Sequence, residues 1–93
     1  MNHDNAPLYL ALSQELRQMR VHLDELAHVL VHDEHVVSTH MGSLQMFDLL
    51  AQRAEEGAAV LDRMAMGAAP SEAIAGIRLE QLHQRFHSVI EGA

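Results

Sequence analysis

The sequence predicts an all-α fold, an antiparallel hairpin of two long helices followed by a third helix. Apolar residues make up 48% of the 93 residues. They are mainly Ala, Leu, Val and Met, most of which favour helices. These residues recur at helical spacing in three segments, and Gly, Pro and Ser residues stand between the segments.

The first predicted helix covers residues 7–32. Six apolar residues in it alternate between spacings of four and three, which places them on one side of a helix, within about 60° of one another. They are Leu12, Leu16, Met19, Leu23, Leu26 and Leu30. Asn5 or Asp4 can cap this helix, and Pro7 suits its first turn because an amide there needs no helical partner.

The second predicted helix covers residues 38–66, after a turn within 33–43 that Ser, Thr and Gly residues indicate. Its apolar stripe is wide and rich in alanine, so a neighbouring helix can approach closely. The stripe consists of Leu44, Phe47, Leu50, Ala51, Ala54, Ala58, Leu61 and Ala65.

The third predicted helix covers residues 71–91. Gly67 is suited to end the second helix, and Pro70 or Ser71 to begin the third. The spacing of four and three returns in Ala75, Leu79, Leu82, Phe86 and Val89. Ile74 and Ile77 lie off this stripe, so the helix should have a second contact surface.

The chain is short enough to be a single domain over residues 1–93. A domain of this size buries only about 60 to 68% of its unfolded surface, so oligomerisation would add to its stability. A first helix of roughly 26 residues would be about 39 Å long, which is long for so small a monomer. We therefore expect a homodimer in which two hairpins form a four-helix-bundle core.

Charge and composition exclude several classes of partner. Six Arg, no Lys and thirteen Asp plus Glu give a net charge of −7, which disfavours nucleic acid. No apolar run approaches the roughly 18 residues of a membrane span, and the N-terminal residues do not resemble a signal peptide. The absence of Cys is typical of a reducing compartment. The expectation is a cytoplasmic protein that binds neither nucleic acid nor membrane.

Eight His residues raise the question of a metal site. Glu25 with His28, and Glu80 with His83, match the Glu-x-x-His pattern of di-iron helical bundles. Eight Glu and eight His in 93 residues produce such pairs by chance. Helical geometry also places Glu25 and His28 opposite the leucine side. A His/Glu metal bundle is the weakest of three hypotheses, and the chain is expected to have no metal of its own.

Asp48 and Gln52 are the strongest candidate site residues. They lie four residues apart, at about 105° and 145° from the centre of the apolar stripe, so both should point outward, side by side. A carboxylate and an amide one turn apart on a rigid helix can complete a foreign active site, where the carboxylate pairs with a cation and the amide orients a water. Glu80 and Gln84 form a second pair with the same spacing.

The run Asp48-Leu-Leu-Ala-Gln52 resembles the Asp-x-x-x-Gln motif of the CheZ-type chemotaxis phosphatases and a related motif of some histidine kinases. The resemblance implies a hairpin that dimerises into a four-helix bundle. It also implies a phosphatase of the aspartyl phosphate on a CheY-like receiver domain of a two-component response regulator. Gln52 would position the attacking water, and Asp48 would pair with the receiver's lysine. The receiver would supply Mg²⁺, so the chain itself would hold no cofactor.

The histidine-kinase version of this motif has a His directly before the Asp. Phe47 occupies that position here, so autokinase activity is not expected. A non-catalytic helical adaptor, which binds a partner protein through its exposed helix faces, is the alternative. Asp48 and Gln52 would then be ordinary polar residues on a solvated helix face.

Overall fold

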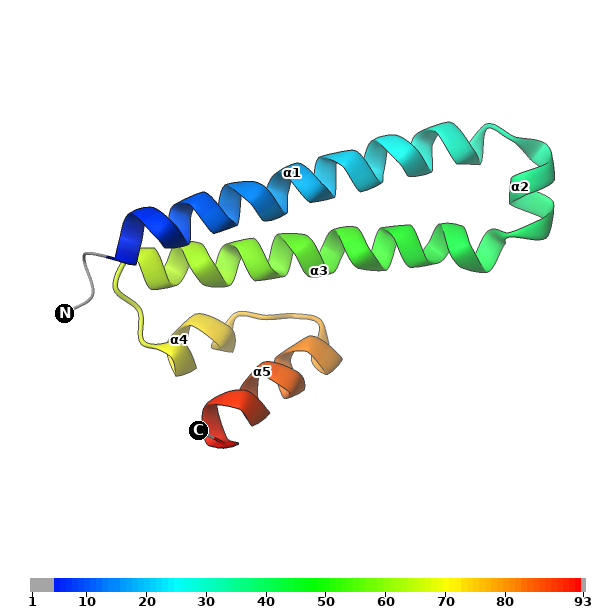
Figure 1. The fold of residues 1–93 in the computed structure, drawn as a ribbon. Coiled ribbons are helices and arrows are strands. Elements are labelled where there is room, and N and C mark those ends of the chain that lie inside the picture. Colours follow the sequence, from blue (N-terminus) through cyan, green and yellow to red (C-terminus); the bar gives the residue numbers. More distant parts are fainter. Residues whose placement is uncertain (1–4, 93) are drawn as a thin grey trace.

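The computed structural model describes residues 5–92 (Figure 1), and this part of the chain contains five helices and no strand. The all-α class is therefore confirmed, whereas the expected number of helices was wrong. The helices are α1 (Ala6–Val31), α2 (Glu34–Thr39), α3 (Met41–Ala65), α4 (Pro70–Ala75) and α5 (Glu80–Gly92).

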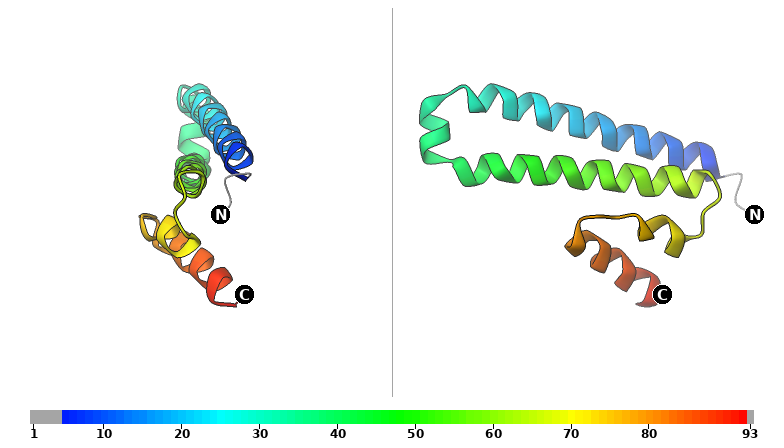
Figure 2. Two further views of the ribbon diagram at one scale, coloured as in Figure 1. Left: turned by 90° about the vertical axis from the view of Figure 1, so that its left-hand side faces the viewer. Right: turned by 180° about the vertical axis from the view of Figure 1, so that it is seen from behind.

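The helices form a thin, elongated molecule. α1 and α3 run antiparallel and are connected by α2 at one end, while α4 and α5 lie on the side of α3 away from α1 (Figures 1 and 2). The molecule measures 53 × 26 × 17 Å. Since a single helix with its side chains is about 10–12 Å wide, a thickness of 17 Å leaves both flanks of the α1–α3 hairpin open to solvent.

The interface between α1 and α3 is built from small side chains. Ala51, Ala54 and Ala58 of α3 are buried, and Ser13 is the buried residue of α1. These alanines belong to the predicted stripe, and this part of the stripe is buried. A Cβ on Gly57 would lie 3.3 Å from a terminal methyl of Leu16, so the absence of a side chain there also favours close approach.

The leucine side of α1 faces α3 only along one edge, where Leu16 and Leu23 are half-buried. Leu12, Met19 and Leu26 are 43%, 52% and 47% exposed, whereas Ser13 is 2% exposed. Helical geometry places Ser13 about 100° from Leu12, so the leucine side is turned toward one flank of the hairpin. This apolar flank is defined by Leu12, Leu16, Met19, Leu23 and Leu26 of α1 with Leu50 of α3.

The predicted helix over 71–91 is wrong, because the chain leaves the helix at residues 76–79 and divides it into α4 and α5. Gly76, a weak helix former, stands at the break. The change of direction allows both Ile74 and Ile77 to reach one core with Leu82, although a continuous helix would place them off its stripe. The second contact surface of this segment therefore packs within the chain, around Val60 of α3.

The predicted turn within 33–43 also contains a helix, α2. The Asp33 carboxylate accepts hydrogen bonds from the backbone N–H groups of His35 (2.9 Å) and Val36 (3.2 Å), and this capping starts a new helical turn. The second long helix consequently begins at Met41 rather than at residue 38.

The other ends agree more closely with the sequence. Gly67 has a φ of +101° just after α3, and Pro70, one of the two predicted starts, is the first residue of α4. Asn5 occupies the N-cap of α1 without a side-chain hydrogen bond, and Asp4, the other predicted cap, lies outside the described residues.

Candidate functional site

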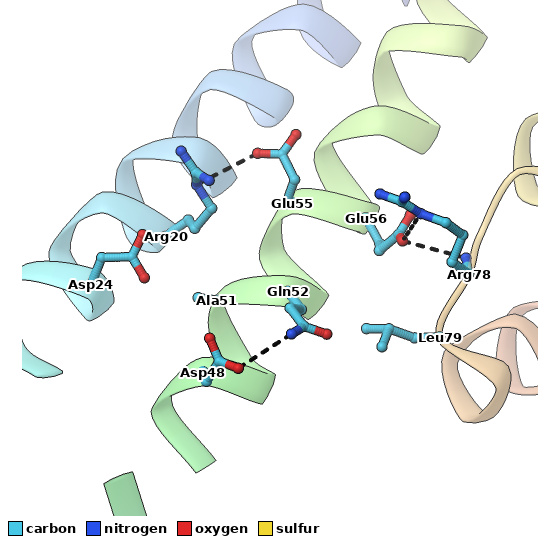
Figure 3. Close-up of a pocket in the computed structure, with 9 residues that line it drawn as sticks. All are labelled: Arg20, Asp24, Asp48, Ala51, Gln52, Glu55, Glu56, Arg78 and Leu79. Carbon is cyan, nitrogen blue, oxygen red and sulfur yellow. Dashed lines mark hydrogen bonds and ion pairs between the residues drawn. The ribbon is translucent and has the colours of Figure 1, made fainter. Parts of the chain in front are cut away.

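A polar hollow lies on the flank of the hairpin opposite the apolar flank (Figure 3). Three parts of the chain contribute to it: α1, α3 and the segment 76–79 between α4 and α5. Its lining consists of Arg20, Asp24, Asp48, Ala51, Gln52, Glu55, Glu56, Arg78 and Leu79. The structure thus places both predicted site residues in one hollow.

Asp48 and Gln52 lie one turn apart on the exposed side of α3. The Gln52 amide nitrogen Nε2 donates a hydrogen bond to Asp48 Oδ2 at 3.3 Å. The Gln52 amide oxygen points away from Asp48, toward Leu79 (Figure 3). The carboxylate therefore orients the amide, and the amide oxygen is left to accept a hydrogen bond from another molecule.

Beside this pair, a network of charged side chains connects α1 to α3. Arg17 donates to Asp62 Oδ2 at 2.6 Å and to Glu55 Oε2 at 3.0 Å, and Arg20 Nε lies 3.5 Å from Glu55 Oε1. Ser13 Oγ donates to Asp62 Oδ1 at 2.6 Å. These contacts set the position of α1 along α3, and with it the shape of the hollow.

The network also changes the acidity of its members. The hydrogen bond from Ser13 holds the pKa of the Asp62 carboxyl below its ordinary value, and the hydrogen bond and charge of Arg17 act in the same direction. Hydrogen bonds to Glu55 and Asp62 raise the pKa of Arg17. Both partners therefore stay charged at neutral pH. Ser13 was not among the predicted site residues, although it lies four residues before Arg17, on the same side of α1.

The segment 76–79 forms the third wall of the hollow. Glu56 Oε1 accepts a hydrogen bond from the backbone N–H of Arg78 at 3.3 Å and lies 3.5 Å from Arg78 Nε. Leu79 lines the hollow on the Gln52 side (Figure 3). Arg78 and Leu79 were not predicted as site residues either, because residues 71–91 were expected to form one continuous helix.

The second acid/amide pair has the same local geometry in different surroundings. Gln84 Nε2 donates to Glu80 Oε1 at 3.0 Å on the exposed surface of α5. Gln84 borders a separate hollow with His83, His87 and Ser88, to which α1 and α3 contribute no side chain. The Glu80–Gln84 pair therefore lies on a single short helix, outside the hollow of the hairpin.

The histidines form two pairs. The ring centroids of His28 and His32 are 4.7 Å apart, and those of His83 and His87 are 6.1 Å apart. Across residues 5–92, no group of three or more Asp, Glu or His side chains is placed to hold a metal ion. In the same part of the chain, every helix falls short of the length or apolarity that crossing a membrane requires.

The fold and the hollow define an all-α protein with an open polar site on a rigid helical hairpin. No protein family, curated protein or solved structure matches the chain. Asp48, Gln52 and Arg78, which line the hollow, are exposed to solvent. Chemistry that needs an enclosed site would therefore require a second molecule to cover it.

Proposed function

We propose that the protein is a phosphatase that acts on the aspartyl phosphate of a CheY-like receiver domain. The observation that carries this proposal is the Asp48–Gln52 pair, an exposed carboxylate that orients an exposed amide near the middle of α3. Such a pair can enter the active site of another protein without a large rearrangement of its own, because both side chains project from one rigid helix.

In the proposed reaction, the Gln52 amide oxygen accepts a hydrogen bond from a water and holds it in line with the aspartyl phosphate. The water oxygen bonds to phosphorus while the bond from phosphorus to the aspartyl oxygen breaks. The receiver's carboxylate leaves with the bonding electron pair, and the protons of the water pass to phosphate and solvent. Asp48 pairs with the receiver's lysine, and the receiver supplies Mg²⁺.

A dephosphorylation assay tests this proposal. Receiver domains from the same organism are phosphorylated with acetyl phosphate, freed of donor, and mixed with the full chain while loss of the phosphoryl group is followed. We expect at least one receiver to lose its phosphoryl group faster than it does alone. Q52A should lower this acceleration about 10²-fold, because the water is no longer positioned. D48N should lower it less, since the amide remains.

Q84A is the matched control, because it removes an amide with the same local partner from α5. It should retain wild-type activity. Loss of activity in Q84A but not in Q52A would move the site to α5. Equal decay with and without the wild-type chain, for every receiver tested, would overturn the phosphatase proposal.

The proposed enzyme is a homodimer, and the apolar flank supports this state. Monomeric proteins rarely expose a contiguous apolar surface of this kind, and Leu12, Met19 and Leu26 are each more than 40% exposed along one side of α1. Two hairpins that pack through their apolar flanks would form a four-helix core. The polar flanks would remain on the outside, where Gln52 could reach a receiver.

The same apolar flank favours a second candidate function, a non-catalytic adaptor. The groove between Leu16, Leu23 and Leu50 could hold an amphipathic helix of another protein instead of a second copy. A monomeric chain that accelerates no receiver's dephosphorylation would favour the adaptor. A dimer that loses activity with Q52A would exclude it as the main function.

A further inference from the structure

We propose that Arg78 is a docking residue that pairs with a carboxylate on the surface of the partner protein, an assignment that rests on the proposed function. The side chain of Arg78 is 91% exposed, although it belongs to the segment that walls the hollow. Its neighbours Ile77 and Leu79 are buried and half-buried. The residues on both sides of Arg78 are therefore held by packing, while the Arg78 side chain extends into solvent.

Glu56 orients the exposed guanidinium. The side chain of Glu56 is only 12% exposed, and its Oε1 lies 3.3 Å from the backbone nitrogen of Arg78 and 3.5 Å from Nε. No hydrogen bond within residues 5–92 uses the two terminal nitrogens of Arg78. A guanidinium held at Nε presents these nitrogens as a planar fork, the geometry that binds a carboxylate with two parallel hydrogen bonds.

Arg78 is the point of this net-negative lining at which a carboxylate of a partner can bind. The lining contains four acidic residues and two arginines. Arg20 lies beside Glu55, and its Nε is buried, so Arg20 serves contacts within the chain. Arg78 is the more exposed cation of this lining, because its side chain is 91% exposed against 42% for Arg20. An acidic partner would be repelled by the rest of the hollow and attracted at this point, which would fix how it approaches Gln52.

The test compares R78A with R85A, which removes the same charge from an exposed position on α5, outside the lining of the hollow. Dephosphorylation is measured over a range of receiver concentrations. We expect R78A to raise KM about tenfold while kcat changes less than twofold, because docking weakens and the chemistry does not change. R85A should match the wild type. R78K should recover only part of the loss, because an ammonium group cannot form the paired hydrogen bonds.

Binding to the receiver with and without beryllofluoride, a mimic of the phosphoryl group, identifies the anion. Weaker binding of R78A to both forms supports a surface carboxylate. A loss confined to the beryllofluoride form would assign Arg78 to the phosphoryl group and overturn the carboxylate. An active wild type with an unchanged KM in R78A would overturn the docking role alone. A wild type that accelerates no receiver's dephosphorylation would overturn the proposed function and the role of Arg78 with it.

Discussion

The hydroxyl of Ser13 donates a 2.6 Å hydrogen bond to the carboxylate of Asp62, across the interface between α1 and α3. Ser13 is 2% exposed and is the buried residue of α1. This bond and the adjacent Arg17–Asp62 ion pair stand at a position where most of the interface is alanine. Alanine side chains alone do little to fix the position of α1 along α3, so these two contacts define that position.

Loss of this bond should make stability depend on pH in a specific way. S13A should lower the free energy of unfolding by about 1–2 kcal/mol at pH 7, measured by urea denaturation. Because Ser13 lowers the folded-state pKa of Asp62 below its ordinary value of 3.8, the stabilisation is fully present above that pH. It is lost as the pH falls through the folded pKa, so the difference between S13A and wild type should shrink below pH 3.8.

Ser88 offers a control for this measurement, since S88A removes a hydroxyl from the exposed surface of α5. It should change stability by less than about 0.5 kcal/mol at any pH. A deficit in S13A that stays constant down to pH 2.5 would attribute the effect to packing rather than to the Asp62 charge.

A charge on the apolar flank should break the proposed dimer. M19E places a carboxylate in the middle of the exposed leucine side, where burial against a second copy would be unfavourable. We expect sedimentation equilibrium to report a dimer for the wild type and a monomer for M19E. Q18E adds the same charge at the next residue, which points away from this side, and should remain dimeric. A wild type that sediments as a monomer would contradict the homodimer.

Gly67 should be sensitive to substitution because its φ of +101° is unfavourable for any residue with a Cβ. G67A should lower the free energy of unfolding by about 1 kcal/mol in thermal or chemical denaturation. G42A is the matched change in the first turn of α3, where a Cβ would meet no atom within 4 Å. It should be neutral or stabilise by up to about 1 kcal/mol. Equal effects of the two substitutions would show that the end of α3 tolerates another conformation.

Arg63 should control how firmly α4 and α5 are held. Its Nε donates to the backbone carbonyl of Ala73 at 2.7 Å, and its guanidinium lies where a Cβ on Gly76 would be 3.2–3.4 Å away. R63M removes the donor but keeps the apolar stem, and it should speed hydrogen exchange in α4 and α5 about tenfold. Exchange in α1 should change much less.

R85M is the control for that experiment, since it shortens an exposed arginine of α5 to the same side chain. Its exchange pattern should match the wild type. Uniform acceleration over the whole chain in R63M would mean that α4, α5 and the hairpin open as one cooperative unit.

The sequence predicted those residues of the candidate site that lie together on one helix, and it did not predict the residues that other parts of the chain contribute. Asp48 and Gln52 are four residues apart on a regular helix, so their common direction follows from helical geometry alone. Arg78 and Leu79 enter the hollow because the chain breaks after α4 and folds back toward Glu56. That break buries Ile77 in a core assembled from three helices, and the spacing of residues within one segment does not contain this information.

The sequence by itself determined that the chain is helical and where its two long helices lie, to within about three residues at each end. Helical spacing, the glycine after α3 and the proline at the start of α4 act over a few residues, so these features are local. The tertiary structure alone decided which side of α1 faces α3. The leucine side is the more apolar one, yet the buried residue of α1 is Ser13, which lies beside that side and bonds to Asp62. Half of the leucine side, Leu12, Met19 and Leu26, therefore stays exposed. That choice depends on close approach between two backbones, a property of the pair of helices and of neither helix alone.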